Sequence, residues 1–161
     1  KKSCKKSMTK VAAFLRIDDR LIHGQVIVGW LPEVRPDRLL VVNDKISEDF
    51  MRQELMALSV PPEVELHFFA TSDIDIELVS ENSFILVASP FDAWKCLQSG
   101  IAPRRFNVGG MHSRDDKQEI FEALHVDEDD RKYFELILDS GIKPVFQPTP
   151  QNEPMPLVDI L

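Results

Sequence analysis

Runs of consecutive apolar residues alternate along this chain with segments whose apolar residues recur every three or four positions. Continuous apolar runs are typical of strands buried on both faces of a sheet, and the longer spacing is typical of amphipathic helices. The apolar runs predict strands at residues 10–17, 38–43, 64–70, 83–89, 104–110 and 142–148. The spaced segments predict helices at residues 22–32, 47–59, 90–100 and 127–141, with a short helix after Ser72. The proline-rich end, residues 149–161, is expected to be irregular.

Strands and helices that alternate in this way predict a doubly wound α/β domain with an open, mostly parallel sheet and helices on both faces. The chain shows no internal repeat and no linker, so residues 10–161 are expected to form a single domain. Residues 1–9 are lysine-rich, too polar to pack, and expected to be a disordered tail in which Met8 is a candidate natural start.

Two helices carry local signals for their ends and their buried faces. Pro32 is expected to end the helix at residues 22–32, because proline cannot continue the hydrogen-bond pattern. Ser47 is expected to cap the helix at residues 47–59. The apolar face of this second helix, which is expected to face the core, contains Phe50, Leu55 and Leu58.

The composition is that of an ordinary globular protein, with 43% hydrophobic and 29% charged residues. No apolar run approaches the roughly 18 residues that a membrane span needs, and no signal-peptide pattern is present. A cytoplasmic protein is therefore expected. The net charge is −8 although the first ten residues hold five lysines and no acid, so the rest of the chain is strongly acidic. Such a surface repels nucleic acid, and no nucleic-acid partner is expected.

The remaining reactive residue types do not form a recognised cofactor or metal motif. Cys4 and Cys96 are expected to be two free thiols, because they form no CxxC pair. His67 lies inside an apolar strand, and His125 precedes an acidic helix. His112 follows the segment NVGGM and either borders the site or is an ordinary loop residue. No histidine pair has metal-ligand spacing, and no glycine-rich nucleotide motif occurs, so neither a metal nor a cofactor is expected.

Polar residues follow several of the predicted strands. Because parallel strands end at one edge of a sheet, and ligands of such folds bind there, these residues are expected to gather into one site. They are Asp18, Asp19, Arg20, His23, Asn43, Asp44, Ser89, Asn107, Gly109 and Gly110.

The segment RIDDRLIHGQV, residues 16–26, has the chemistry of a phosphate site. His23 falls in the first turn of a predicted helix, where free N–H groups favour an anion. Arg16 and Arg20 add guanidinium groups that suit phosphate oxygens, and Gly24 allows close approach. His23 is thus a candidate covalent phosphate acceptor. The alternative is a salt-bridged surface loop with a capping histidine.

This segment resembles the active-site segment of the IIB subunits of the mannose/fructose/sorbose family of the bacterial phosphoenolpyruvate-dependent sugar phosphotransferase system (PTS). RLLVVND at residues 38–44, FNVGGM at residues 106–111 and VDEDD before the last long helix support the resemblance in the same order. It extends from about residue 9 to about residue 147, which is most of the chain.

The resemblance implies a phosphotransferase. His23 would accept a phosphoryl group through Nδ1 from a phosphohistidine on a IIA subunit and pass it to a sugar carried by the membrane IIC and IID subunits. Such a protein would be cytoplasmic and peripherally associated with the permease, without metal or nucleotide. Arg16, Arg20, Asp18 and Asp19 match the charged residues of the family loop. The residues expected to bind phosphate or substrate are Gly24, Asn43, Asp44, Asn107, Gly109 and Gly110.

One position departs from the family pattern. Gln147 stands where family members carry an arginine in the last strand, which weakens the prediction of transfer to sugar more than that of phosphate capture. Two alternatives stay open: a regulatory phosphoacceptor that does not deliver phosphate to sugar, and a domain that binds a small anion reversibly. The sequence names no sugar and is compatible with a homo-oligomer.

Overall fold

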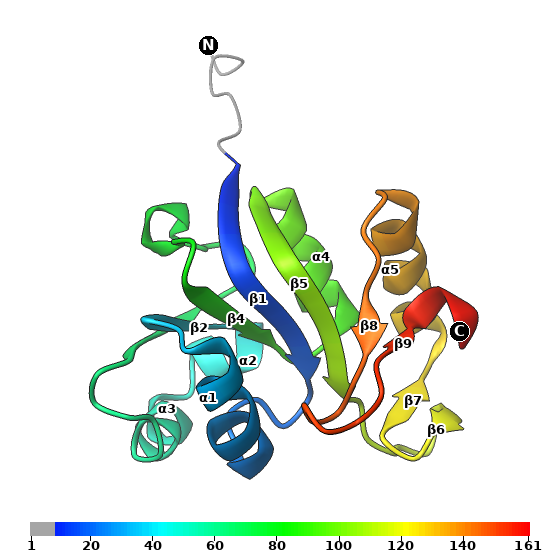
Figure 1. Ribbon diagram of the computed structural model, residues 1–161, viewed down its shortest axis with the longest axis horizontal. Helices are drawn as coiled ribbons and strands as arrows, with labels where there is room; N and C mark the ends of the chain where they lie inside the picture. The colour runs from blue at the N-terminus through cyan, green and yellow to red at the C-terminus, as the bar shows by residue number, and fades with distance from the viewer. Residues whose placement is uncertain (1–8) are drawn as a thin grey trace.

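The computed structural model describes residues 9–161, which form one central seven-stranded sheet with helices on both faces (Figure 1). The strands, in their order across the sheet, are β3 (Glu65–Phe69), β2 (Arg38–Val42), β4 (Ser83–Val87), β1 (Lys10–Asp18), β5 (Ile101–Gly110), β8 (Val145–Phe146) and β9 (Met155–Pro156). Strands from β3 to β8 are parallel, and β9 pairs antiparallel with β8. The predicted α/β class with a mostly parallel sheet is confirmed.

The helices divide into two layers. The helical turns η2 (Gln25–Trp30), α1 (Leu31–Val34), α2 (Asp44–Ser47) and α3 (Phe50–Ala57) cover one face, and α4 (Pro90–Gln98) and α5 (Glu128–Asp139) cover the other (Figure 1). Short helical turns η3 (Ile76–Leu78) and η4 (Leu157–Asp159) complete the set within residues 9–161.

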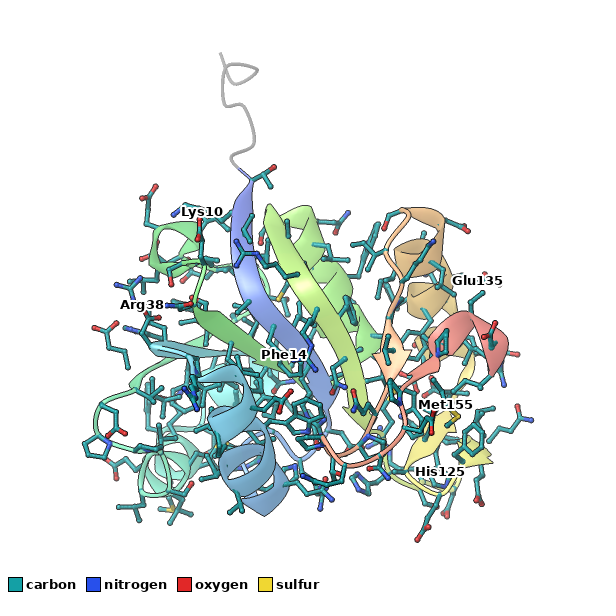
Figure 2. The ribbon with its side chains drawn as sticks, in the orientation of Figure 1. Lys10, Phe14, Arg38, His125, Glu135 and Met155 are labelled. Atoms are coloured by element: carbon teal, nitrogen blue, oxygen red, sulfur yellow. The ribbon has the colours of Figure 1, made fainter. Side chains whose placement is uncertain are left out.

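Alternate residues of the central strands enter the two apolar layers, as the period of a strand requires. In β1, Leu15 and Ile17 pack toward α4 and α5, while Phe14 packs toward the opposite layer. Phe14, near the middle of the sheet in Figure 2, stacks on Trp30 with ring centroids 5.0 Å apart. This contact anchors the helix that follows β1, and so the loop between them.

The two helices with local end signals differ from expectation. Pro32 does not end its helix, because it occupies the first turn of α1, where a missing N–H is tolerated, and the helix continues to Val34. The predicted helix at residues 47–59 corresponds to the shorter α3, which is capped by Asp49 and not by Ser47. Ser47 instead ends the preceding helix α2, which is capped by Asn43.

The apolar face predicted for α3 is also wrong. Phe50, Leu55 and Leu58 are 73%, 62% and 83% exposed, and the buried residue of this helix is Met56. Met56 joins the apolar layer on this face of the sheet, so the spacing of α3 indicates helix formation correctly but does not identify the face that packs.

The strands near the carboxyl end of the chain differ from expectation. The strand expected at residues 142–148 is reduced to β8, and the end expected to be irregular contributes β9. A hairpin of β6 (Gln118–Phe121) and β7 (Leu124–Val126) was not predicted, because its strands have only four and three residues and β6 begins with two polar residues. The hairpin is attached to the end of β5 by backbone hydrogen bonds between Met111 and the strand β7 region.

Two remaining expectations concern the thiols and membrane spans. Cys96 is buried and free, and burial raises the pKa of its thiol, so it belongs to the core. Cys4, Met8 and the predicted tail, apart from Thr9, lie outside the described residues. Among residues 9–161, none of the helices has the length and apolarity to cross a bilayer.

Candidate active site

His23 lies in the loop that joins β1 to its helix, immediately before the first helical turn. Its carbonyl accepts hydrogen bonds from the N–H groups of Val26 (3.1 Å) and Ile27 (3.0 Å). Leu21 adopts a left-handed backbone conformation with φ of 60°, which costs on the order of 1–3 kcal/mol for a non-glycine residue. Burial of the Leu21 side chain holds this turn in place. The predicted position of His23 at a helix start is confirmed.

Asp18 fixes the orientation of the His23 ring. An oxygen of Asp18 lies 2.8 Å from His23 Nε2, while the N–H of Gln25 points at Nδ1 from 3.3 Å. An ionised carboxylate can only accept, so Nε2 carries the proton and Nδ1 keeps a lone pair, toward which the N–H of Gln25 is directed. The His23 side chain is 16% exposed. The arrangement presents a neutral imidazole whose Nδ1 can act as a nucleophile.

Asp18 stays ionised although it is completely buried. Burial by itself would raise its pKa, but the hydrogen bond with His23 and the charge of Arg16 outweigh that effect and hold the pKa below its usual value. Arg16 Nη2 donates to Asp18 across 2.9 Å, and the backbone N–H of Arg20 donates across 3.1 Å. The carboxylate therefore has enough partners to remain charged beneath the loop.

Arg16 is completely buried, which disagrees with the expectation that it holds phosphate oxygens. Its guanidinium donates to the Asn107 side chain (2.7 Å) and the Gln147 carbonyl (3.3 Å), besides Asp18, and lies over the ring of Trp30. Burial lowers its pKa, and the carboxylate of Asp18 offsets part of that shift. Through its contact with Asp18, the buried Arg16 positions that carboxylate.

The residues of β5 that were expected to bind phosphate serve this buried network. Asn107 links Arg16 to the Gln147 carbonyl, to which it donates across 3.0 Å. Gly109 leaves the space that the Arg16 guanidinium occupies, because any Cβ at this position would overlap it. Gly110 accepts a backbone hydrogen bond from Asp19 (3.0 Å) and so fixes the end of β1 against β5.

Arg20 is the arginine of the loop that reaches solvent, with its side chain 47% exposed. Together with Gln25, His112, Phe121 and Pro148 it lines a cleft of about 510 Å³, called here the Arg20 cleft. A Cβ at Gly24 would have no atom within 4 Å, so open space adjoins the helix start.

Two backbone N–H groups of the loop, besides the Arg20 guanidinium, can donate hydrogen bonds to an anion. Among residues 9–161, none accepts a hydrogen bond from the backbone N–H of His23 or Gly24. These two donors and the Arg20 guanidinium are available to phosphoryl oxygens next to His23.

Asp19 and His112 form a contact that the sequence did not reveal. His112 Nδ1 lies 2.6 Å from one oxygen of Asp19, and the backbone N–H of His112 donates to the other across 2.7 Å. His112 therefore borders the site, which settles the choice left open for it. Only the fold brings these residues together, because they are far apart in the chain.

Asn43 and Asp44 do not join the His23 loop but line a second cleft of about 660 Å³. Asn43 caps α2 through the N–H of Ile46 and donates to Asp92 across 3.0 Å. Asp44 accepts from the backbone of Thr71 across 2.7 Å. Both side chains thus hold neighbouring loops. The second cleft touches the active loop at Asp19 and Leu21.

Asp92 is a buried carboxyl that sequence reasoning missed. Burial raises its pKa to about 6, against the hydrogen bonds from Asn43 and the backbone of Ala88, which lower it. Ser89, expected at this edge, caps α4 by accepting from the N–H of Asp92. In the sequence, Asp92 is an ordinary polar residue in the first turn of a helix. Only its burial in the folded protein distinguishes it from other such residues.

The other histidines lie elsewhere. His67 is in the outer strand β3, beside Phe69, and His125 is in the hairpin, where Nδ1 contacts the Met111 carbonyl (Figure 2). Among residues 9–161, one group of possible metal ligands comes together, formed by Asp18, Asp19 and His112. Its carboxylates already pair with Arg16, His23 and His112, so a cation would have to displace these partners.

Known proteins share both the sequence pattern and the fold. A family described as "PTS system sorbose subfamily IIB component" matches residues 12–161. The fructose-specific EIIB component of the PTS of Bacillus subtilis (strain 168) is 31% identical over 151 residues, covering 91% of this chain and 93% of that protein. The mannose-specific EIIAB component of Escherichia coli (strain K12) is 30% identical over 156 residues, and the chain spans 48% of that longer protein.

Among solved structures, an N-acetyl-galactosamine IIB component from Streptococcus pyogenes superimposes with a TM-score of 0.84 at 26% identity. The superposition covers 97% of this chain and all of that one. The match of a family over almost the entire chain, the relatives and the shared fold agree with one another. The chain belongs to the sorbose-subfamily IIB components of the sugar phosphotransferase system.

Proposed function

We propose that His23 accepts a phosphoryl group from a phosphorylated IIA protein and delivers it to a sugar during uptake through membrane IIC and IID subunits. IIB components act as phosphotransferases, and the residue assignment rests on one observation above all. Asp18 holds Nε2 of His23 at 2.8 Å, which leaves Nδ1 as the nucleophile in the same loop as the exposed Arg20.

The capture step balances without a base. Nδ1 of neutral His23 attacks phosphorus, the bond from phosphorus to the donor histidine breaks, and the bonding pair returns to the donor ring. The phosphorylated His23 ring keeps its Nε2 proton and is cationic, and the carboxylate of Asp18 stabilises that charge. Because phosphoryl transfer depends mainly on position and charge, this geometry supplies what the step needs.

Three donors surround the place where the phosphoryl oxygens would lie. Arg20 supplies a guanidinium, and the backbone N–H groups of His23 and Gly24 supply two more hydrogen bonds. Arg16 acts indirectly, since it is buried and holds Asp18 in position. No metal ion is needed, because the positive charges of the loop neutralise the transferred group.

Membership of the family supports the proposed partners and place of action. A IIA protein would supply phosphate, IIC and IID would present the sugar, and the protein would work in the cytoplasm beside the permease. Relatives carry names that specify fructose, mannose and N-acetylgalactosamine, so a hexose or an amino-hexose is the proposed substrate class.

The experiment that tests this assignment is intact-protein mass spectrometry. The wild type and His23→Ala are incubated with phosphoenolpyruvate, the general PTS proteins and a phosphorylated IIA. The wild type is expected to gain one acid-labile phosphoryl group and the variant none. Uptake of label by His23→Ala would show that another residue is the acceptor. A wild type that stays unlabelled with a competent donor would instead favour reversible anion binding.

A regulatory phosphoacceptor is the second candidate, and Gln147 favours it. The Gln147 side chain donates to the carbonyls of Asn152 (3.0 Å) and Pro150 (3.4 Å), so it stabilises a turn and does not line the Arg20 cleft. The positive charge that family members carry here is therefore missing. Adding sugar and permease-containing membranes to the phosphorylated protein separates the two candidates, because only a transporter subunit loses its phosphoryl group to sugar.

A further inference from the structure

Two consecutive aspartates orient two histidines at the end of β1. Asp18 holds Nε2 of His23 at 2.8 Å, and Asp19 holds Nδ1 of His112 at 2.6 Å. Each contact anchors one ring nitrogen and leaves a lone pair on the opposite nitrogen of that ring. In His23 this is Nδ1, which faces the N–H of Gln25 at 3.3 Å, and in His112 it is Nε2. The loop thus presents a second oriented imidazole that phosphate capture does not use.

The second imidazole lies next to the first dyad. A ring nitrogen of His112 and carboxylate oxygens of Asp18 and Asp19 all lie within 4.8 Å of one another. Gly110 makes this approach possible, since a Cβ there would lie 3.1 Å from His112 Cε1 and 3.3 Å from Asp18 Oδ1. His112 is 42% exposed and lines the Arg20 cleft, so an acceptor molecule can reach it.

Asp19 makes two contacts with His112, one with its backbone and one with its ring. The hydrogen bond from the His112 backbone to Asp19 already fixes the loop after β5. The further contact between Asp19 and Nδ1 fixes the tautomer in which Nδ1 carries the proton and Nε2 is an acceptor. A carboxylate that orients an imidazole toward a hydroxyl group is the arrangement of a general base.

We propose that His112 is the general base for delivery of phosphate from His23 to the acceptor hydroxyl, an inference that rests on the proposed function. The hydroxyl proton moves to Nε2 of His112 as the hydroxyl oxygen bonds to phosphorus. The bond between phosphorus and Nδ1 of His23 breaks, and its electron pair returns to the ring, which becomes neutral. Asp19 stabilises the imidazolium of His112, which then releases its proton to water.

Capture and delivery differ in their need for this base. Capture exchanges one imidazole for another and releases no proton. Delivery to a hydroxyl must remove one proton, and a positioned base accelerates such a step by about 10²–10⁴-fold. A substitution at His112 is therefore expected to slow delivery selectively.

The test uses His112→Gln, with His67→Gln as a matched control on the far strand β3. Both proteins and the wild type are phosphorylated by phospho-IIA in single turnover, and the rate of capture is recorded. Each phosphoprotein is then mixed with sugar and permease-containing membranes, and loss of the phosphoryl group is followed across pH. The charged groups near His112 also affect the pH dependence of delivery. Asp18 and Asp19 lie close to its ring, and Arg20 and Glu122 line the same cleft.

For His112→Gln we expect capture within about twofold of the wild type and delivery slowed about a hundredfold or more. We also expect the wild-type delivery rate to fall at acid pH, because a general base must be unprotonated to accept the hydroxyl proton. The delivery rate of the variant should not show this fall. Asp19→Asn, which keeps an acceptor for the His112 backbone, should slow delivery in the same direction. His67→Gln should match the wild type in both steps.

Three outcomes would overturn the inference. They are an unchanged delivery rate in His112→Gln, an equal loss of capture and delivery in this variant, or a fall of its delivery rate at acid pH like that of the wild type. A wild type that captures phosphate but never delivers it also overturns the inference, while leaving His23 as the acceptor. Failure of the wild type to capture phosphate at all would mark failure of the proposed function itself.

Discussion

The guanidinium of Arg16 lies over Gly109, in the space that any side chain at position 109 would fill. This relationship joins β1 to β5 beneath the active loop, because Arg16 also holds Asp18 at 2.9 Å. Gly109 therefore supports the loop that carries His23, because Arg16 fills the space that the glycine leaves. A change at this position should be transmitted to His23 through Arg16 and Asp18.

Gly109→Ala is expected to lower both stability and capture. The new methyl group must displace a buried, hydrogen-bonded guanidinium, and such overpacking costs about 1–3 kcal/mol. Chemical denaturation measures the first effect, and phosphorylation by phospho-IIA measures the second. Gly24→Ala is the matched control for stability, because a Cβ there meets no atom within 4 Å. Equal stability of the two variants would show that the packing over Gly109 is loose.

Asp18→Asn is expected to reduce capture and to alter the response to acid. The substitution leaves Arg16 buried without its counter-charge, which destabilises the fold by about 3–5 kcal/mol. It also removes the negative charge that stabilises the cationic phosphorylated His23 ring, which slows capture on the order of a hundredfold.

The pH dependence of Asp18 has a defined sign. Its folded pKa is lower than its unfolded pKa of about 3.9, so it stabilises the fold above that value. The stabilisation declines as pH falls below about 4 and is gone below the folded pKa. The temperature of thermal unfolding should therefore decrease more steeply with falling pH for the wild type than for Asp18→Asn. Parallel curves would contradict the assignment of an ionised, paired Asp18.

Arg20→Gln should separate catalysis from stability. The side chain is half exposed and pairs only loosely with Asp18, at 3.7 Å, so unfolding free energy should change by less than about 0.5 kcal/mol. Loss of its charge beside the transferred group should slow capture by roughly a hundredfold. Arg104→Gln, at an exposed arginine on β5, is the matched control and should leave capture unchanged. A large loss of stability in Arg20→Gln would instead assign Arg20 a structural role.

Asp92→Asn is expected to stabilise the protein at neutral pH. Burial raises the pKa of Asp92 to about 6, above the value of 3.8 for an ordinary aspartate. Below about pH 4 the group is neutral in both states, and above it the unfolded state ionises first, so the folded state loses stability until about pH 6. Asparagine can still accept from Asn43 and Ala88 but does not ionise.

The difference in unfolding free energy between Asp92→Asn and the wild type should therefore grow with pH. Each pKa unit corresponds to about 1.4 kcal/mol, so the gain between pH 4 and pH 7 should be roughly 3 kcal/mol. Urea unfolding at a series of pH values measures it. A difference that does not change with pH would show that Asp92 titrates normally in the folded protein.

Several features were predictable because they depend on short stretches of sequence. The apolar runs are long enough to identify the central strands, since each is buried on both faces. His23 could be placed at a helix start because strand, loop and helix are contiguous there. Helix α3 shows the limit of this approach, because Phe50, Leu55 and Leu58 have helical spacing yet stay exposed.

Contacts between distant segments could not be predicted from these patterns. Arg16 looked like a phosphate ligand, but pairing of β1 with β5 places it over Gly109 and buries it. The sequence left open whether His112 borders the site or is an ordinary loop residue, and the same pairing brings it to Asp19. The hairpin of β6 and β7 is stabilised largely by its attachment to the end of β5, so its own short strands carried little signal.

Local patterning was enough to predict the α/β class and the sheet edge at which His23 lies, because periodicity and loop chemistry are properties of neighbouring residues. The packing of β1 against β5 decided which charges are buried, which arginine reaches solvent and which histidine joins the site. Burial and side-chain pairing arise only when strands far apart in the chain lie side by side, and for that reason they are properties of the folded molecule.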